Sequence, residues 1–447
     1  MNFFGTILLN LLIYGMGLYV IKRNGGIKQN LPFAFSWLIF IVYHFITPLY
    51  FYLSGRETIW GDEDTNRNVG VDISDYYFIG MNYYAIANLC FILGYLVLTR
   101  KVMPVLSPLK YTLPMDKLRV GVIASFLICF SLVLFNFLNE GLNPILILFG
   151  DTQNEIAGIT ATSNYLKNFS DSIIALLIMA YFYKVKKPVF YLMVVAGFLL
   201  FVLMGFRYRI ILTLIGMLSI SLYMMKGRRF MILRYSLVGV VVLYFMFFLT
   251  YNRFVFTRGE WSQLEANPIN FEYDLFFEQT RGMLDDITIL KYYDTDPHAR
   301  HDNGITFLYF LVRLMPRAIV GNEFKDSFYP FPAYTIFTEA YDVQKYWGKR
   351  NTGEAPLHMA YFVIAGGLPA LFFGSFLVGL ILKWVQMRFT PDNDLNVVVL
   401  VLVTSALFQW YTRGYFPGFV DHLGFMLLGF WIARRIAHLP RLTFHSK

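Results

Sequence analysis

Apolar runs of about 20 residues recur along the whole chain, and this feature restricts the fold more than any other. A membrane-spanning helix needs roughly 20 mainly apolar residues to cross the hydrocarbon core of a bilayer. The 447 residues are 57% hydrophobic and only 15% charged, which lies outside the range of soluble proteins. The sequence therefore predicts an all-α, polytopic membrane protein.

About eleven segments meet this length criterion. We expect spans at residues 3–21, 32–54, 76–99, 118–138, 166–183, 188–206, 209–225, 232–251, 358–382, 394–412 and 419–437. The first run has no positive charge before it and is followed by Lys22 and Arg23, so we expect a span rather than a cleavable signal peptide. Cys90 and Cys129 both lie inside apolar runs, which argues against a disulfide framework, a zinc site and redox chemistry.

Basic residues gather in alternate loops, and this pattern predicts the orientation. Short cytoplasmic loops collect Lys and Arg. The six basic loops carry Lys22 and Arg23; Arg100, Lys101, Lys110 and Lys117; Lys184, Lys186 and Lys187; Lys226, Arg228 and Arg229; Lys383 and Arg388; and Arg434, Arg435, Arg441 and Lys447. We therefore expect a periplasmic N-terminus and a cytoplasmic C-terminus. The net charge of +9 is explained by these loops and does not indicate nucleic acid.

The predicted organisation has three parts. Residues 1–251 form the first eight spans, residues 252–356 form a large periplasmic loop subdomain, and residues 357–447 form the last three spans with a cytoplasmic tail. A loop of that length is usually functional. Within it, "ITFLYFLVRLM" is apolar but too short to cross a bilayer, and Pro316 ends it. We expect an interfacial helix there, at the outer leaflet.

Arg207 and Arg209 stand at the mouth of an apolar run, where an ordinary span has Leu or Trp. They either anchor the helix at the lipid headgroups or bind an anionic ligand. Further arginines lie on the same predicted side, and guanidinium groups are planar, permanently charged forks that suit a diphosphate. We expect diphosphate or substrate contacts from Arg207, Arg209, Arg258, Arg281, Arg313, Arg317 and Arg413.

Three stretches carry a resemblance to a known family. "GFRYRIILTLIGMLSISLYMMKGRR" resembles the Gly-x-Arg-leading span of bacterial O-antigen polymerases, the oligosaccharide repeat-unit polymerases of the Wzy type. "RLMPRAIVGNEFKDSFYPFP" resembles their proline-arginine segment in the large outer loop. "GEAPLHMAYFVIAGGLPALFFGSFLVGLI" resembles the segment in which a Glu-led stretch enters a Gly-rich span. The family form Glu-x-Tyr-x-Asn-Phe-Gly is replaced here by "EAPLHMAYFVIAGG", which lacks the Asn.

The resemblance implies a GT-C-like glycosyltransferase of the bacterial inner membrane. Such an enzyme polymerises undecaprenyl-diphosphate-linked oligosaccharide units into surface polysaccharide at the periplasmic face, without metal or cofactor. The implied partners are a lipid-linked donor, a lipid-linked acceptor, the lipid bilayer and a chain-length regulator protein, with no nucleic acid. An O-antigen ligase uses the same donor and stays open as an alternative, as does a lipid-linked oligosaccharide flippase.

The chemistry of such a transfer can be matched to residues. Arginines would stabilise the departing diphosphate, and the acceptor hydroxyl would need a base. Glu354 and His358 are the candidates for catalysis, although Pro356 between them makes the first turn irregular. Asp285 and Asp286 are further outer carboxylates that either act as a base or simply solvate a helix.

Other polar residues have two interpretations each. The acidic turns at Asp62–Asp64 and Asp294–Asp296 either hold a divalent cation or are ordinary surface turns, and we expect no metal. His44, within the second span, is either a packed histidine or a proton carrier. Ion-coupled transporters usually need acids at membrane depth, and the expected spans have none securely inside, which weighs against a transporter.

Overall fold

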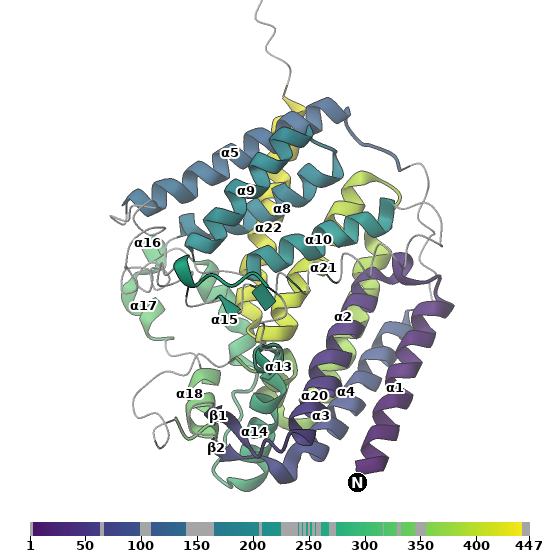
Figure 1. The fold of residues 1–447 in the computed structure, drawn as a ribbon, viewed down its shortest axis with the longest axis vertical. Helices are drawn as coiled ribbons and strands as arrows, with labels where there is room; N and C mark the ends of the chain where they lie inside the picture. Colours follow the sequence, from purple (N-terminus) through teal and green to yellow (C-terminus); the bar gives the residue numbers. More distant parts are fainter. Residues whose placement is uncertain are drawn as a thin grey trace, which may run out of the picture. The chain divides into compact units, whose positions relative to one another are not determined.

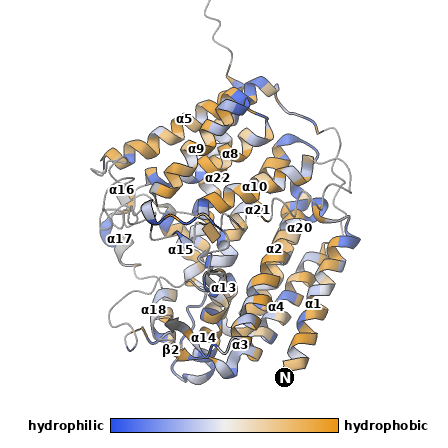
Figure 2. Ribbon diagram, viewed as in Figure 1, coloured by the Kyte–Doolittle hydropathy of each residue, from blue (hydrophilic) through white to orange (hydrophobic). Residues whose placement is uncertain are grey.

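The computed structural model confirms the all-α class and a multi-pass arrangement. It describes residues 3–62, 67–98, 109–139, 165–204, 208–224, 261–267, 274–315, 317–328, 332–343 and 355–439, with residue 345 and single positions between 240 and 255. Seven helical stretches in these ranges are long and apolar enough to cross a membrane: Phe3–Arg23, Ile27–Leu53, Ser74–Val97, Met115–Asn139, His358–Arg388, Asp394–Arg413 and Phe416–His438. Apolar residues run along these helices (Figure 2).

Shorter helices account for three further predicted spans, at α8 (Phe169–Phe182), α9 (Lys187–Leu203) and α10 (Tyr208–Met224). The predicted span at 232–251 lies almost wholly outside the described residues. The chain divides into two compact units, each made of segments that are distant in sequence. Helices α21 (Asp394–Arg413) and α22 (Phe416–His438) contribute to both.

The first unit comprises residues 1–104, 276–390 and 406–421. Its elements are α1 (Phe3–Arg23), η1 (Ile27–Asn30), α2 (Leu31–Ile41), η2 (Val42–Ile46), α3 (Thr47–Leu53), β1 (Thr58–Asp62), β2 (Arg67–Asp72), η3 (Ser74–Tyr76), α4 (Tyr77–Val97), most of α13 (Asp274–Thr280), α14 (Gly282–Thr295), α15 (Ile305–Leu314), α16 (Arg317–Val320), α17 (Asn322–Asp326), α18 (Pro332–Ala340) and α20 (His358–Arg388). Helices α4 and α20 lie side by side (Figure 1).

Glycines allow α4 and α20 to approach closely. A Cβ atom at Gly94 would lie 1.9 Å from the Phe376 carbonyl oxygen, and one at Gly379 would lie 2.0 Å from the Phe91 carbonyl oxygen. Small residues at such crossings let helix backbones pack together inside a membrane, where dispersion forces rather than the hydrophobic effect drive association. The sequence pattern alone did not indicate this pairing.

We expect Gly379→Ala to destabilise the protein, because the added methyl group forces the two backbones apart. Overpacking of this kind costs about 1–3 kcal/mol. The thermal unfolding midpoint of purified protein in detergent measures the effect. Gly15→Ala is the matched control, because a Cβ there meets nothing within 4 Å. Equal midpoints for the two variants would contradict the close packing of α4 and α20.

Helix α20 is interrupted at Gly366 and Gly367. Gly367 has φ 70° and ψ −156°, a conformation that L side chains rarely adopt, and Pro369 follows it. The carbonyl of Ile364, two residues before Gly366, accepts a hydrogen bond from the Asp302 amide at 3.0 Å. Broken helices are tolerated at membrane depth where protein groups satisfy the backbone. The break therefore ties α20 to the segment that precedes α15.

The connection between α3 and α4 folds into a small antiparallel hairpin, which was not predicted from the sequence. Thr58 pairs with Asp72 and Trp60 pairs with Val69. Ile59 and Trp60 are buried, which explains why the residues "TIW" form a strand rather than a solvated loop.

Helix α15 matches the short apolar helix expected before Pro316. It ends at Leu314, and the exposed side chains of Ile305, Leu308 and Leu311 recur at a spacing of three residues along it. That spacing places them on one face of the helix. The location of α15 at the outer leaflet stays a prediction.

The second unit comprises residues 105–275, 391–405 and 422–447. It contains α5 (Met115–Asn139), η4 (Tyr165–Asn168), α8, α9, α10 and η5 (Trp261–Gln263). Asp394 at the start of α21 is fully buried and accepts hydrogen bonds from the Thr112 hydroxyl and the Tyr183 hydroxyl, each at 2.9 Å. Arg434 pairs with the same carboxylate at 3.3 Å. This network joins the ends of α8, α21 and α22.

Candidate functional site

The start of α14 lies against the segment that leads into α20. Asp286 accepts a hydrogen bond from the Tyr84 hydroxyl at Oδ2 and one from the Leu357 amide at Oδ1, both at 2.8 Å. A Cβ atom on Gly282 would lie 2.7 Å from Leu357 Cδ2 and 3.4 Å from the carbonyl oxygen of Ala355. The residues immediately after Glu354 are therefore fixed on the first turns of α14.

Asp286 is completely buried. Burial raises the pKa of this carboxyl to about 8, although the hydrogen bonds from Tyr84 and from the Leu357 amide lower it. Desolvation disfavours the charged form of a carboxyl group, which is the physical cause of the shift. The carboxyl therefore keeps its proton to a higher pH than an exposed aspartate does, and its hydrogen bonds hold α4, α14 and the start of α20 together.

His358, the first residue of α20, is buried in an aromatic cluster. Its ring lies 4.6 Å from the Tyr411 ring and 5.4 Å from the Phe40 ring, between centroids. The His44 ring, from the π-helical turn η2, stacks at 6.0 Å from His358. Asn88 Nδ2 lies 3.4 Å from His44 Nδ1. The two histidines are thus packed among aromatic rings, away from solvent.

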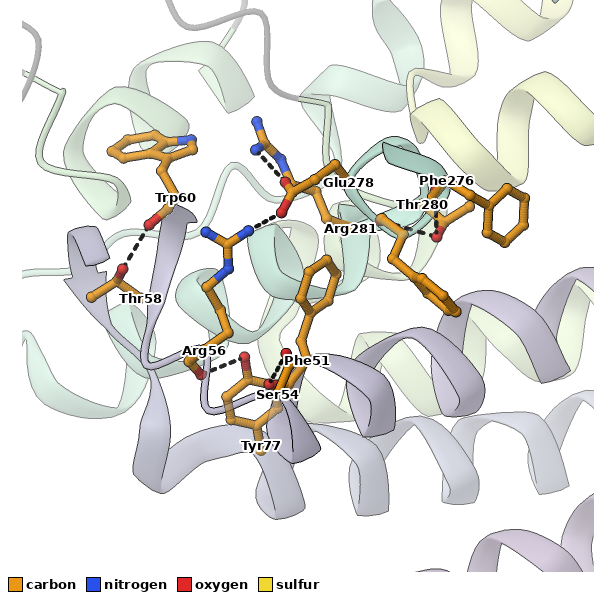
Figure 3. A network of polar contacts seen from close by, with 11 residues as sticks. Phe51, Ser54, Arg56, Thr58, Trp60, Tyr77, Phe276, Glu278, Thr280 and Arg281 are labelled. Atoms are coloured by element: carbon orange, nitrogen blue, oxygen red, sulfur yellow. Dashed lines mark hydrogen bonds and ion pairs between the residues drawn. The ribbon is translucent and has the colours of Figure 1, made fainter. Parts of the chain in front are cut away.

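Arg281 lies at the corner between α13 and α14, and Glu278 of α13 holds it. Arg281 Nη1 donates to Glu278 Oε2 at 3.0 Å. The other carboxylate oxygen, Oε1, pairs with Arg56 Nη2 from the connection between α3 and β1. Figure 3 shows the two guanidinium groups on the same carboxylate. We call Arg56, Glu278 and Arg281 the arginine–glutamate cluster.

The elements that carry this cluster are packed firmly together. The Tyr50 ring of α3 stacks on the Phe277 ring of α13, with centroids 3.7 Å apart. The hydroxyl oxygens of Thr47 and Thr280 lie 3.0 Å apart. Arg56 itself is fixed at its backbone carbonyl, which accepts a hydrogen bond from the Tyr77 hydroxyl at 2.9 Å. These contacts hold in place the backbone segments that carry the Arg56 and Arg281 side chains.

Arg313 and Arg317 do not share one continuous helix. Helix α15 ends before Met315, which is extended, and Arg317 is the first residue of the separate helix α16. Arg313 pairs with Asp421 and lies 3.4 Å from the Tyr415 hydroxyl. Arg413, at the end of α21, is exposed. These arginines therefore come from separate elements rather than from one helix face.

Arg209 is buried in the second unit and pairs with Asp171. Arg209 Nε donates to Asp171 Oδ1 at 2.7 Å, and His422 Nδ1 lies 2.6 Å from Asp171 Oδ2. Only 2% of the Arg209 surface is exposed. A buried cation needs such a partner. The pair explains how α10 accommodates an arginine at its first turn.

Three of the predicted site residues lie outside the described residues: Glu354, Arg207 and Arg258. Of the other six, the first unit contains Arg281, Arg313, Arg317, Arg413 and His358, whereas Arg209 belongs to the second. The structure thus brings Arg281 and the chain that follows Glu354 to the same end of α14.

Arg56 and Glu278 were not among the site residues predicted from the sequence. Arg56 directly follows the second span in "SGRETIW", and a basic residue at a predicted periplasmic helix end was a usable signal. For Glu278 the sequence offers no signal except its spacing of three residues from Arg281.

The acidic turn at Asp294–Asp296 accepts hydrogen bonds from other groups of the protein. Asp294 accepts a hydrogen bond from the Tyr76 hydroxyl, and Asp296 Oδ1 accepts one from the His298 amide at 2.8 Å. The Asp62–Asp64 turn lies largely outside the described residues. Within the part of the chain that the structure covers, no group of three or more His, Cys, Asp or Glu residues is arranged to hold a metal ion.

Comparison with known proteins gives no relative: no protein-family model, no curated protein and no solved structure matches this chain.

Proposed function

We propose that this protein polymerises undecaprenyl-diphosphate-linked oligosaccharide units by glycosyl transfer at the periplasmic face of the bacterial inner membrane. The observation that carries the proposal is the meeting of two sequence-distant segments. Arg281 stands beside Gly282, which packs against Ala355 and Leu357 in the segment after Glu354. A diphosphate-binding group and a base are the two elements that this transfer needs, and both segments belong to one compact unit.

In the proposed reaction, a hydroxyl of the acceptor oligosaccharide attacks the anomeric carbon of the donor. The bond between that carbon and the phosphate oxygen breaks, and undecaprenyl diphosphate leaves with the electron pair. The hydroxyl proton passes to Glu354. Arg281 stabilises the charge that develops on the departing diphosphate, a role that guanidinium groups perform well in a partly dry site.

His358 and Asp286 have positioning roles in this proposal, because both are buried. Asp286 holds the Leu357 amide, and His358 packs the first turn of α20 against Tyr411. Together they fix the end of the segment that follows Glu354. A preorganised segment keeps the base within reach of the acceptor without reorganisation at the moment of reaction.

Arg281→Lys is expected to reduce the long-chain polysaccharide made in cells by about tenfold or more. Lysine keeps the charge but loses the fork geometry, and one hydrogen bond to a charged group contributes about 1.5–3 kcal/mol. The measurement is the glycan ladder of a deletion strain complemented with each variant at equal protein level. Arg119→Lys is the control, since Arg119 belongs to the second unit, where it pairs with Asp116 and donates from Nε to the Tyr183 carbonyl.

Other outcomes of this experiment would contradict the role of Arg281 or favour another function. A normal ladder in Arg281→Lys would reject the role of Arg281. In the deletion strain, single lipid-linked units should persist while long chains vanish. Long chains that remain on the carrier would favour a ligase, and loss of all units from the outer face would favour a transporter.

Full polymerisation by purified enzyme in excess chelator is also expected, because arginines take the place of a metal.

A further inference from the structure

We propose that Arg56 and Arg281 form a phosphate-binding clamp that Glu278 occupies in the resting protein, and that a phosphate of the lipid-linked diphosphate displaces this carboxylate. The inference rests on the proposed function and names Arg56 as a binding residue and Glu278 as the group that the substrate replaces.

The donors of the cluster suit an anion with more acceptor oxygens than Glu278. Two guanidinium groups meet one carboxylate here. Arginine presents five donors in a rigid fork that matches the oxygens of a phosphate, and such charge-assisted hydrogen bonds are about twice as strong as neutral ones. A diphosphate brings more negative charge and more acceptor oxygens to the same donors than one carboxylate does.

The clamp is a tertiary feature rather than a local pair. Arg281 is three residues from Glu278, a spacing at which helical neighbours often pair. Arg56 is 222 residues from Glu278 in sequence, so the fold must bring the second guanidinium to the same carboxylate. Two cations held close together repel each other unless an anion lies between them. Glu278 supplies that anion in the structure.

The exposure of the cluster allows exchange. The side chains of Arg56, Glu278 and Arg281 are 11%, 19% and 24% exposed, so a ligand oxygen can reach them while most of the surrounding water is excluded. Partial burial strengthens charge interactions relative to those at an open surface.

The protein side of the clamp is rigid enough to keep its shape when Glu278 leaves. The stacking of Tyr50 on Phe277 fixes α13 to α3 independently of the carboxylate. The Arg56 guanidinium also lies over the Phe51 ring, 5.3 Å from its centroid. None of these contacts involves the Glu278 carboxylate, so they can persist when its side chain rotates away.

The test measures binding to the purified full chain in detergent micelles, with inorganic pyrophosphate and undecaprenyl diphosphate as separate probes. Arg56→Lys is expected to weaken binding of undecaprenyl diphosphate by about tenfold or more. Glu278→Gln is expected to tighten it by about threefold or more, because the competing carboxylate is gone. If pyrophosphate shows the same pattern, the phosphates alone carry recognition, and if only the lipid probe does, the polyprenyl chain contributes.

Thermal unfolding separates the clamp from a purely structural ion pair. Without ligand, Glu278→Gln is expected to unfold at a lower temperature than the natural protein, because the two guanidinium groups then repel each other. Pyrophosphate or undecaprenyl diphosphate is expected to raise the midpoint of this variant more than that of the natural protein. Arg119→Lys, at a partly exposed pair of the second unit, is expected to leave binding of both probes unchanged.

Unchanged or weaker binding by folded Glu278→Gln would overturn the displacement, and unchanged binding by Arg56→Lys would overturn the clamp. Neither result requires glycan transfer, so failure here is distinguishable from failure of the proposed function. Diphosphate binding that follows the expected pattern in a protein that makes no polymer would keep the clamp and reject the polymerase.

Discussion

Asp171→Ala is expected to lower the free energy of unfolding by about 3–5 kcal/mol, because it leaves the buried guanidinium of Arg209 without its carboxylate. The side chains of Arg209 and Asp171 are only 3% and 1% exposed, so water cannot replace the lost partner. Reversible unfolding of purified protein in mixed micelles measures the loss. Asp116→Ala is the control, because its pair with Arg119 is exposed and is expected to contribute less than about 1 kcal/mol.

The double variant Asp171→Leu, Arg209→Met gives the companion measurement. Replacing both members of a buried ion pair with apolar residues is often neutral or stabilising, so we expect it to recover most of the stability lost in Asp171→Ala. A small effect of Asp171→Ala would contradict the structural role of the pair. Retained polymerisation in a stable double variant would remove Arg209 from the proposed diphosphate-binding arginines.

Asp286→Asn is expected to make the protein less sensitive to pH. The folded pKa of Asp286 is about 8 and its ordinary value is 3.8, so the folded state holds a proton that the unfolded state releases between these values. This contribution to stability is complete below about pH 4 and is lost as the pH rises through about 8. The unfolding free energy of the natural protein should therefore fall by up to about 1.4 kcal/mol per pH unit in that window.

Thermal midpoints at pH 6 and pH 8 measure this difference in detergent. Asparagine cannot ionise and offers one oxygen where the carboxyl accepts from Tyr84 and from the Leu357 amide, so some stability is lost at pH 6. The decisive quantity is the change between the two pH values, which should shrink in Asp286→Asn. Asp342→Asn, at a half-exposed carboxylate of the same unit, is the control. An unaltered pH dependence in Asp286→Asn would contradict the raised pKa.

The sequence determined the class of the protein and the positions of most of its helices. An apolar run of about 20 residues has few alternatives to a helix, because a bilayer leaves no other partner for its backbone groups. The long helices at Phe3–Arg23 and Met115–Asn139 therefore begin and end within a few residues of the predicted spans. The hairpin Thr58–Asp72 escaped prediction because its strands are short and its stability comes from burying Ile59 and Trp60.

The partners of charged residues could not be predicted from the sequence, because they depend on contacts between distant segments. Arg209 and Arg281 had the same predicted role, yet the first is buried on Asp171 and the second shares Glu278 with Arg56. In the same way, only the fold places the Leu357 amide on Asp286.

The sequence by itself thus determined that the chain is a multi-span helical membrane protein, because length and apolar character decide whether a segment can cross a bilayer. Tertiary structure alone decided which arginine is buried on a carboxylate and which lie in a partly exposed cluster. The physical reason is that a charge in a low-dielectric interior must be paired with a specific opposite charge, and that partner is supplied by packing rather than by the neighbouring sequence.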